Sequence, residues 1–589
     1  MKGLTRYVSI LFSLLLAASL VGFGPAAPAA HAAGAVEIDT LFRAAAANST
    51  LRAILTFDHY PTAAEVAQVR AAGLQAHTFR VLPMIAVQGL KSAIEGLAGM
   101  PGLRSIYRDA PLQYLLDDSV PFIGADRVWN ELGYTGAGVG VAVIDSGIDG
   151  MHPDIAYPTV TVQNVKILAN NFFTGEPVLL ENIPNTDTSS GHGTHVAGTI
   201  AGRGTASAGR YTGVAPGAHL VGIGAGDTLV ILFALEGFDY AIANKDRYNI
   251  RVISNSWGTS GAFSPGDPVN VASKLAYDKG MVVVFAAGNE GPDQNTLNPY
   301  AVAPWVIGVA AGCTTDKGVS DTAVRCKPGS LLAEFSSRGI PGDPLYHPTI
   351  TAPGVWIAAA RASTGATINA LTVGLNVFCQ PANLVFYTCA NGTSMATPHV
   401  SGVVALMLQA RPGLHPDLVK VALTSTATPM YRPDGSRYEE WEVGAGYVNA
   451  YEAVKKARRM SLKKGQFRDK KGKLHETYTE TFTWSGTVGV GVDPAGAPAH
   501  DYYEQNVGEK AIRATVRVEW GDPIQDIDLY VYAPDGALAG SSAQALTNVE
   551  ETTFSGEFLA SGAYTVDTRG WLTVAAPYNG SFAIEYVLR

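Results

Sequence analysis

Charged residues are scarce in this chain of 589 residues. Only 16% of the residues are Asp, Glu, Lys or Arg, and 42 basic against 51 acidic side chains leave a net charge of −9. Nucleic-acid-binding domains are usually strongly basic, so this balance argues against a nucleic-acid partner. A hydrophobic fraction of 47% is that of a globular protein, and the length predicts two to four domains.

Apolar runs long enough to span a bilayer are also absent after the first residues. Lys2 and Arg6 precede the run VSILFSLLLAASLVGFG, which is followed by Pro25 and small residues. This order predicts a secretory signal peptide over residues 1–33. An uncleaved membrane anchor is the alternative, but the run is slightly short for a span. We therefore expect a secreted, extracellular protein without membrane contact once the signal is removed.

Cysteine is rare, with four residues in the whole chain. Export permits disulfides, and four cysteines allow three pairings. Pairing of sequence neighbours, Cys313–Cys326 and Cys379–Cys389, closes two short loops and is the pairing that we favour. No C-x-x-C zinc spacing is present.

The periodicity of apolar residues divides the chain into three units. Residues 34–116 mix short strand patterns with helical patterns, which predicts a small α+β unit. Across residues 117–458, apolar runs such as MVVVFAAGN alternate with helical spacing, which predicts an α/β fold with a parallel sheet covered by helices. Residues 477–589 alternate apolar and polar positions between turns, which predicts an all-β sandwich.

A basic segment precedes the last unit. Ten Lys or Arg and one Asp lie between Lys455 and Lys473. Such a run predicts a solvated, flexible linker, which we place at residues 459–476. An exposed site for proteolytic trimming is the alternative.

Three motifs of the α/β unit contain the residue types of nucleophilic catalysis. VAVIDSGID places Asp145 at a predicted strand end, GHGTHVAG contains His192, and GTSMATPHVSG contains Ser394. A hydroxyl nucleophile needs a base, and the base needs a carboxylate that fixes its tautomer. An N-cap is the structural alternative for Ser394, because Ser is a preferred capping residue. His192 and His195 are three apart, as in a metal site, but the Glu of H-E-x-x-H is absent.

These motifs resemble those of the subtilisin-like serine peptidases, the subtilases, and their Asp, His, Ser order is that of subtilisin. The resemblance covers residues 117–458. It implies that Asp145 orients the base, that His192 is the general base and acid, and that Ser394 is the nucleophile. His195 is then a structural histidine. The implied protein is a monomeric serine endopeptidase that acts on proteins or peptides without a catalytic cofactor. A non-catalytic adhesion protein on a degenerate scaffold is the alternative, which the intact motifs disfavour.

The resemblance also assigns residues around the nucleophile. The side chain of Asn289 and the backbone N–H of Ser394 are implied to form the oxyanion hole. The substrate pocket is implied to be walled by Ser256, Trp257 and Gly258 on one side and by Ala287 and Gly288 on the other. By composition alone, Asn289 also suits a turn and Trp257 also suits a core.

The flanking units carry weaker resemblances. Residues 34–116 resemble the inhibitor-type propeptides of subtilases, which implies an autoprocessed zymogen cut near Leu116, with the propeptide as intramolecular inhibitor. Residues 477–589 resemble bacterial pre-peptidase C-terminal domains through W-G-D-P and D-I-D-L-Y-V-Y. Family members use the Asp of an H-P-D as a calcium ligand, which implies a structural calcium at Asp154. Calcium needs six to eight oxygens, so a turn Asp is the alternative.

Overall fold

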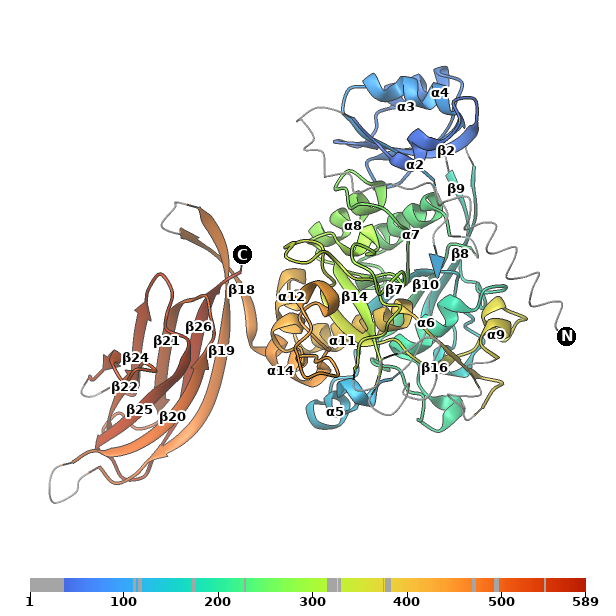
Figure 1. Ribbon diagram of the computed structural model, residues 1–589. Helices are drawn as coiled ribbons and strands as arrows, with labels where there is room; N and C mark the ends of the chain where they lie inside the picture. The colour runs from blue at the N-terminus through green and yellow to red at the C-terminus, as the bar shows by residue number, and fades with distance from the viewer. Residues whose placement is uncertain are drawn as a thin grey trace.

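Three units follow one another along the chain in the computed structural model (Figure 1). The described residues are 36–588, except 110–112, 115–118, 172–175, 227–228, 315–325, 327–329, 374–375, 377–382, 469–472, 492–496 and 545–546. The predicted signal peptide and the predicted cleavage point at Leu116 lie outside these residues.

The N-terminal unit is a five-stranded sheet in the order β1-β5-β2-β4-β3. The β1–β5 pair is parallel and the other pairs are antiparallel. A capping box between Thr62 and Glu65 starts its longest helix, because each side chain satisfies a backbone N–H of the first turn. The elements are β1 (Glu37–Ile38), α2 (Thr40–Ala44), β2 (Thr50–Phe57), α3 (Ala63–Ala71), β3 (Gln75–Thr78), β4 (Met84–Leu90), α4 (Lys91–Glu95) and β5 (Leu103–Arg108).

The central unit is built on an eight-stranded sheet in the order β15-β14-β13-β11-β7-β10-β8-β9. Its strands are β7 (Gly140–Asp145), β8 (Thr161–Asn171), β9 (Glu176–Leu180), β10 (His219–Gly224), β11 (Ile250–Asn255), β13 (Val282–Ala286), β14 (Ile307–Gly312) and β15 (Ile350–Pro353). The predicted α/β class is confirmed, but the sheet is mixed, because β9 pairs antiparallel with β8.

Helices cover both faces of this sheet, and β7 shows why. All six of its residues are buried, and successive side chains enter opposite cores: Val141 and Val143 one, Ala142 and Ile144 the other. The helices of the first face are α6 (His192–Ala201), α11 (Thr393–Ala410), α12 (Pro416–Ser425) and α14 (Ala450–Arg459). Those of the second face are α7 (Ile231–Ala243) and α8 (Pro268–Asp278). Shorter elements are β6 (Gln113–Tyr114), α5 (Ala125–Arg127), β12 (Trp257–Gly258), β16 (Ile357–Ala360), α9 (Thr367–Leu371), β17 (Tyr387–Ala390) and α13 (Glu440–Val443).

The C-terminal unit is an antiparallel β-sandwich, as predicted, which lies beside the central unit (Figure 1). Its two sheets have the orders β18-β19-β26-β21-β24 and β20-β25-β22-β23. The strands are β18 (Met460–Arg468), β19 (Leu474–Val488), β20 (Ala499–Val507), β21 (Ala511–Trp520), β22 (Asp526–Tyr532), β23 (Leu538–Ser542), β24 (Val549–Ser555), β25 (Gly562–Leu572) and β26 (Ala576–Val587).

The basic segment is not a flexible linker over its described residues. Its first residues end α14, and Met460–Arg468 form β18, which pairs with β19. Two of its basic side chains share a buried partner. Lys456 Nζ lies 3.0 Å and Arg459 Nε lies 3.5 Å from the carboxylate of Glu480. The positive charge therefore ties the sandwich to α14, and the sandwich begins at residue 460 rather than at residue 477.

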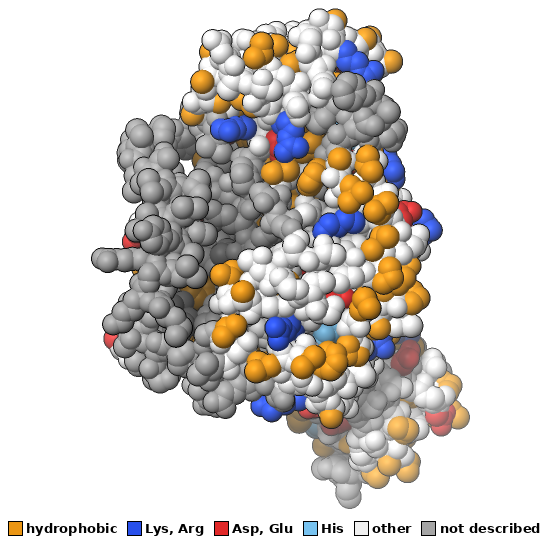
Figure 2. All heavy atoms as spheres, turned by 90° about the vertical axis from the view of Figure 1, so that its right-hand side faces the viewer, with side chains coloured by type: hydrophobic (Ala, Val, Ile, Leu, Met, Phe, Trp, Pro, Cys, Tyr) orange, Lys and Arg blue, Asp and Glu red, His pale blue; other side chains and the backbone are white. Residues whose placement is uncertain are grey.

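Within the described residues, no helix combines the length and apolarity needed to cross a membrane. On the face shown in Figure 2, apolar side chains are spread among polar atoms and isolated Lys and Arg side chains. Leu168, Val178 and Leu180 of the β8–β9 hairpin are among the exposed apolar residues of the chain.

Candidate active site

Asp145 and His192 meet at the C-terminal edge of the central sheet. Asp145 is the last residue of β7, and His192 is the first residue of α6, where Gly191 turns the chain with φ of 81°. The two residues are buried, and Asp145 Oδ1 lies 2.6 Å from His192 Nδ1. The Ser146 N–H donates to the same oxygen at 2.8 Å. The carboxylate thus places the ring proton on Nδ1, which leaves Nε2 as the basic nitrogen.

Ser394 lies in the first turn of α11, which packs against α6. Pro398, four residues later, has no N–H to donate, so the Ser394 carbonyl lacks a helical partner. The Ser256 hydroxyl donates to this carbonyl instead, at 2.8 Å. In return, Ser394 Oγ donates to the Ser256 carbonyl at 2.5 Å. Ser256 therefore anchors the predicted nucleophile at the end of β11.

The hydroxyl of Ser394 has its hydrogen bond to Ser256, and no Ser394–His192 hydrogen bond is present among the described residues. A rotation about the Cα–Cβ bond of Ser394 would move its hydroxyl from the Ser256 carbonyl toward His192 Nε2. Catalytic hydrogen bonds commonly tighten only when substrate is bound, so this arrangement is compatible with a nucleophile–base pair.

Asn289 follows β13 and is oriented by Thr393. Asn289 Oδ1 accepts hydrogen bonds from Thr393 N, at 3.0 Å, and from Thr393 Oγ1, at 2.9 Å. Thr393 Oγ1 also accepts from the Gly288 N–H at 3.2 Å. Because the amide oxygen is occupied, Nδ2 is the end of Asn289 that remains to donate. Sequence reasoning missed Thr393, although it lies within the GTS motif.

A cavity of about 160 Å³ lies between β12 and the end of β13. Of the predicted substrate residues, Trp257, Gly258 and Gly288 border it together with Asn289. Ser256 and Ala287 are fully buried beside it. A Cβ on Gly258 would come within 2.3 Å of Asn298 Nδ2, so this strand edge accepts only glycine without a shift.

Trp257 is a core residue through its side chain. The indole is fully buried, its Nε1 donates to the Ile144 carbonyl at 2.7 Å, and its ring lies edge-on to Phe285. The indole therefore belongs to the core, and only the backbone of Trp257 lies at the strand edge that is predicted to wall the substrate pocket. Asn298, which sequence reasoning missed, joins the two walls: its Nδ2 donates to the Trp257 and Ala286 carbonyls at 3.1 and 2.8 Å.

His195 has no metal-binding geometry. It is fully buried, and its Nε2 lies 3.2 Å from the Ile357 carbonyl and 3.1 Å from the Thr388 carbonyl. Burial lowers the pKa of His195 to about 3, so the ring is a neutral donor that ties α6 to β16 and β17. The described residues contain no group of three His, Cys, Asp or Glu side chains that could hold a metal ion.

Asp154 does not fit the calcium site implied by H-P-D. The side chain is buried, Oδ1 accepts from the Ala206 N–H at 2.9 Å, and Oδ2 accepts from the Tyr387 hydroxyl at 2.7 Å. Both carboxylate oxygens are thus used by protein donors, whereas calcium gathers six to eight oxygens around itself. The Tyr387 hydroxyl and the Ala206 N–H therefore bind the two oxygens that the resemblance assigned to calcium.

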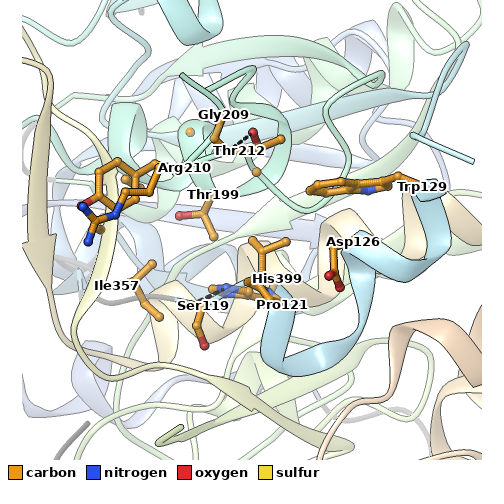
Figure 3. A pocket seen from close by; sticks show the side chains of 16 residues that line it. Ser119, Pro121, Asp126, Trp129, Thr199, Gly209, Arg210, Thr212, Ile357 and His399 are labelled. Carbon is orange, nitrogen blue, oxygen red and sulfur yellow. Dashed lines mark hydrogen bonds between the residues drawn. The ribbon is translucent and has the colours of Figure 1, made fainter. Parts of the chain in front are cut away.

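A second cavity, of about 260 Å³, lies beside α11 (Figure 3). His399 at its wall donates through Nδ1 to the Met395 carbonyl and accepts at Nε2 from the Ser119 N–H, at 2.7 and 2.9 Å. Burial lowers the pKa of His399 to about 4, which keeps Nε2 an acceptor. This histidine anchors the chain just after the predicted cleavage region.

The strand edge at Trp257–Gly258 is already paired. Gln113–Tyr114 of β6 lie antiparallel to it, with Tyr114 opposite Trp257 and Gln113 opposite Gly258. These two residues precede the predicted cleavage point, so the segment that follows the N-terminal unit is an added strand at this edge.

One predicted disulfide is present between Cys313 and Cys326, with an S–S distance of 2.04 Å. Cys389 is also disulfide-bonded. Its predicted partner, Cys379, lies outside the described residues.

A carboxylate–imidazole pair, a serine in the first turn of a helix and an amide at a strand end are the groups that serine hydrolases use. The family model for the subtilase family matches residues 136–464. Serine protease AprX of Bacillus subtilis (strain 168) is 33% identical over 371 residues, which cover 61% of this chain and 76% of AprX. Subtilisin E of the same strain is 35% identical over 345 residues, which cover 55% and 73% of the two chains. The chain belongs to the subtilase family and is a subtilisin-like serine endopeptidase.

Fervidolysin from Fervidobacterium pennivorans, described as a keratinolytic enzyme related to subtilisin, resembles the chain in fold. Its crystal structure aligns with a TM-score of 0.51 and 18% identity, over 92% of this chain and 97% of fervidolysin. At this identity the likeness concerns the fold alone.

Proposed function

We propose that Asp145, His192 and Ser394 form a catalytic triad that hydrolyses peptide bonds through an acyl-enzyme. The observation that carries this proposal is the 2.6 Å contact between Asp145 Oδ1 and His192 Nδ1. It holds the base in one tautomer beside the helix that bears Ser394, which is the arrangement a hydroxyl nucleophile requires.

The reaction follows from these positions. His192 Nε2 removes the Ser394 proton as Oγ attacks the scissile carbonyl, and then gives that proton to the leaving amine. The Ser394 N–H and Asn289 Nδ2 donate to the oxyanion, since the amide oxygen of Asn289 is held by Thr393. Water then attacks the ester by the reverse route and releases the second product.

The substrate binds as an added strand along Trp257–Gly258, the edge that β6 occupies. Its side chain next to the cleaved bond enters the cavity between Gly258 and Gly288. The substrates are proteins or peptides, and the family's chemistry requires no catalytic cofactor.

The same strand pairing supports an autoinhibited precursor in which residues 34–116 act as propeptide. Two carboxylates, one from each unit, also hold the N-terminal unit against the central unit. Asp109 of the N-terminal unit accepts from the Leu232 N–H of α7 at 2.9 Å. Asp239 of α7 accepts from the backbone N–H of Arg80, Val81 and Leu82, at 2.9, 2.6 and 3.3 Å. Cleavage near Leu116 would free the cleft once these contacts are lost.

The proposed protein is secreted through residues 1–33 and acts as a monomer, and the sandwich from β18 onward is proposed to be a bacterial pre-peptidase C-terminal domain. A structural calcium is not proposed at Asp154, because both of its oxygens are hydrogen-bonded within the protein.

Labelling with a fluorophosphonate tests the triad in the processed chain. We expect a covalent adduct at Ser394 and loss of casein cleavage in proportion to labelling. Ser394→Ala is expected to remain unlabelled and to accumulate as the uncut precursor. Thr397→Val, a buried threonine of the same helix, serves as the control for folding and should label and cleave normally. A folded, processed parent chain that is not labelled would refute the proposal.

A further inference from the structure

Asp187 is a second buried carboxylate next to the proposed triad. It lies in the loop before α6 and is fully buried. Its Oδ1 accepts from the Gly191 N–H at 2.8 Å and from Ser146 Oγ at 3.0 Å. Its Oδ2 accepts from the Thr194 N–H at 3.0 Å and from Thr194 Oγ1 at 2.6 Å. Four donors therefore converge on one carboxylate, as expected for an ionised acid.

These contacts reach both the helix of the base and the strand of the orienting carboxylate. Gly191 and Thr194 flank His192 at the start of α6, so Asp187 caps this helix from the preceding loop. Ser146 directly follows Asp145, and its Oγ accepts from the Gly193 N–H at 2.9 Å while it donates to Asp187. Asp187 and Ser146 thus bind β7 and α6 to each other at the point where Asp145 meets His192.

We propose that Asp187 is a positioning residue of the active site, which holds Asp145 and His192 in register and whose negative charge favours the imidazolium formed during the reaction. The inference rests on the proposed triad. Asp187 is fully buried, so it acts on the pair through its hydrogen bonds to Ser146 and to the start of α6.

The charge of Asp187 matters because few other charges face this region in the part of the chain that the structure describes. His195 and His399 are neutral at physiological pH, since burial lowers their pKa to about 3 and about 4. Burial raises the pKa of the Asp187 carboxyl, and hydrogen bonds from Thr194 and Gly191 oppose that rise.

Three charged groups on neighbouring elements complete the set. Asp145 lies at the end of β7, and Asp149 follows it with its carboxylate bound to the N–H and hydroxyl of Ser363. Lys166 of β8 donates through Nζ to the carbonyl of Thr186, the residue before Asp187, at 2.6 Å. None of these three groups accepts hydrogen bonds from the Gly191 and Thr194 N–H groups. They therefore cannot replace the Asp187 carboxylate when it is removed.

Asp187→Asn tests the proposal, because it keeps the shape, removes the charge and turns an NH₂ toward a backbone N–H. We expect kcat to fall about 10- to 100-fold with KM nearly unchanged, as for a small displacement of reacting groups. We expect the acid limb of the kcat/KM profile to move to lower pH by about half a unit or more, a typical size for the loss of a nearby charge. Asp434→Asn, an exposed carboxylate that binds Ser436, is the matched control and should match the parent.

Ser146→Ala separates the positioning of Asp145 and His192 from the effect of the Asp187 charge. It also tests the proposal if Asp187→Asn does not fold. It removes the bridging hydroxyl and keeps the carboxylate. We expect kcat to fall, whereas KM and the acid limb of the kcat/KM profile should stay unchanged. A Ser146→Ala enzyme with parental kcat, or a folded Asp187→Asn enzyme with a parental acid limb, overturns the inference while the parent still labels at Ser394. Absence of labelling in the parent overturns the proposed function itself.

Discussion

Replacement of Thr393 by valine isolates the orientation of the oxyanion donor. Thr393 is fully buried, and its hydroxyl supplies one of the two hydrogen bonds that hold Asn289 Oδ1, at 2.9 Å. Valine has the same shape without the hydroxyl. An oxyanion donor contributes about 2.7–4 kcal/mol to catalysis, a range measured in subtilisin itself. If half of its orientation is lost, the barrier rises by about 1.4–2 kcal/mol, which lowers kcat about 10- to 30-fold.

The same change also leaves the Gly288 N–H without its 3.2 Å acceptor. We expect a loss of roughly 1 kcal/mol in the free energy of unfolding. Steady-state kinetics on a chromogenic peptide and denaturant unfolding measure the two effects separately. Thr397→Val is the matched control, because Thr397 Oγ1 donates to the Thr393 carbonyl and does not contact Asn289. Equal kcat values for the two variants, or a raised KM with parental kcat, would refute the orienting role of Thr393.

Two further perturbations test other parts of the fold. Tyr387→Phe removes the 2.7 Å hydrogen bond to Asp154 and should lower the free energy of unfolding by about 1–3 kcal/mol. Denaturant unfolding should show the same loss in calcium buffer and in EDTA. A loss seen only in calcium buffer would make Asp154 a calcium ligand. Asp239→Asn weakens the hold on residues 80–82 and should shorten the lag before activity appears in the full chain by about tenfold or more. Asp246→Asn, an exposed residue beyond the same helix, is its control, and an equal lag in both variants would contradict the role of Asp239.

Local sequence was sufficient to locate the motifs that contain the candidate catalytic residues and to distinguish three units, although it placed the start of the sandwich too late. Asp145 and Asn289 follow continuous apolar runs, so their place at strand ends could be read from the alternation of strands and helices. The Ser394 motif begins a helix for reasons within the motif itself: a preceding glycine and small residues that pack closely. Each of these signals depends on residues that are neighbours in sequence.

Partners that are distant in sequence were decided by the tertiary structure alone. Asp154 is adjacent to Pro153 in a motif that implies calcium, yet its partner is Tyr387 of β17, 233 residues later in the chain. The basic segment implied a linker because its charges had no local partner, and Glu480 on the next strand provides one. Asp187 shows no periodic or motif signal, and only the approach of Ser146 to the start of α6 gives it a role. Sequence patterns report which residues share a face or begin an element, whereas a buried carboxylate takes its function from the donors that folding brings within 3 Å of it.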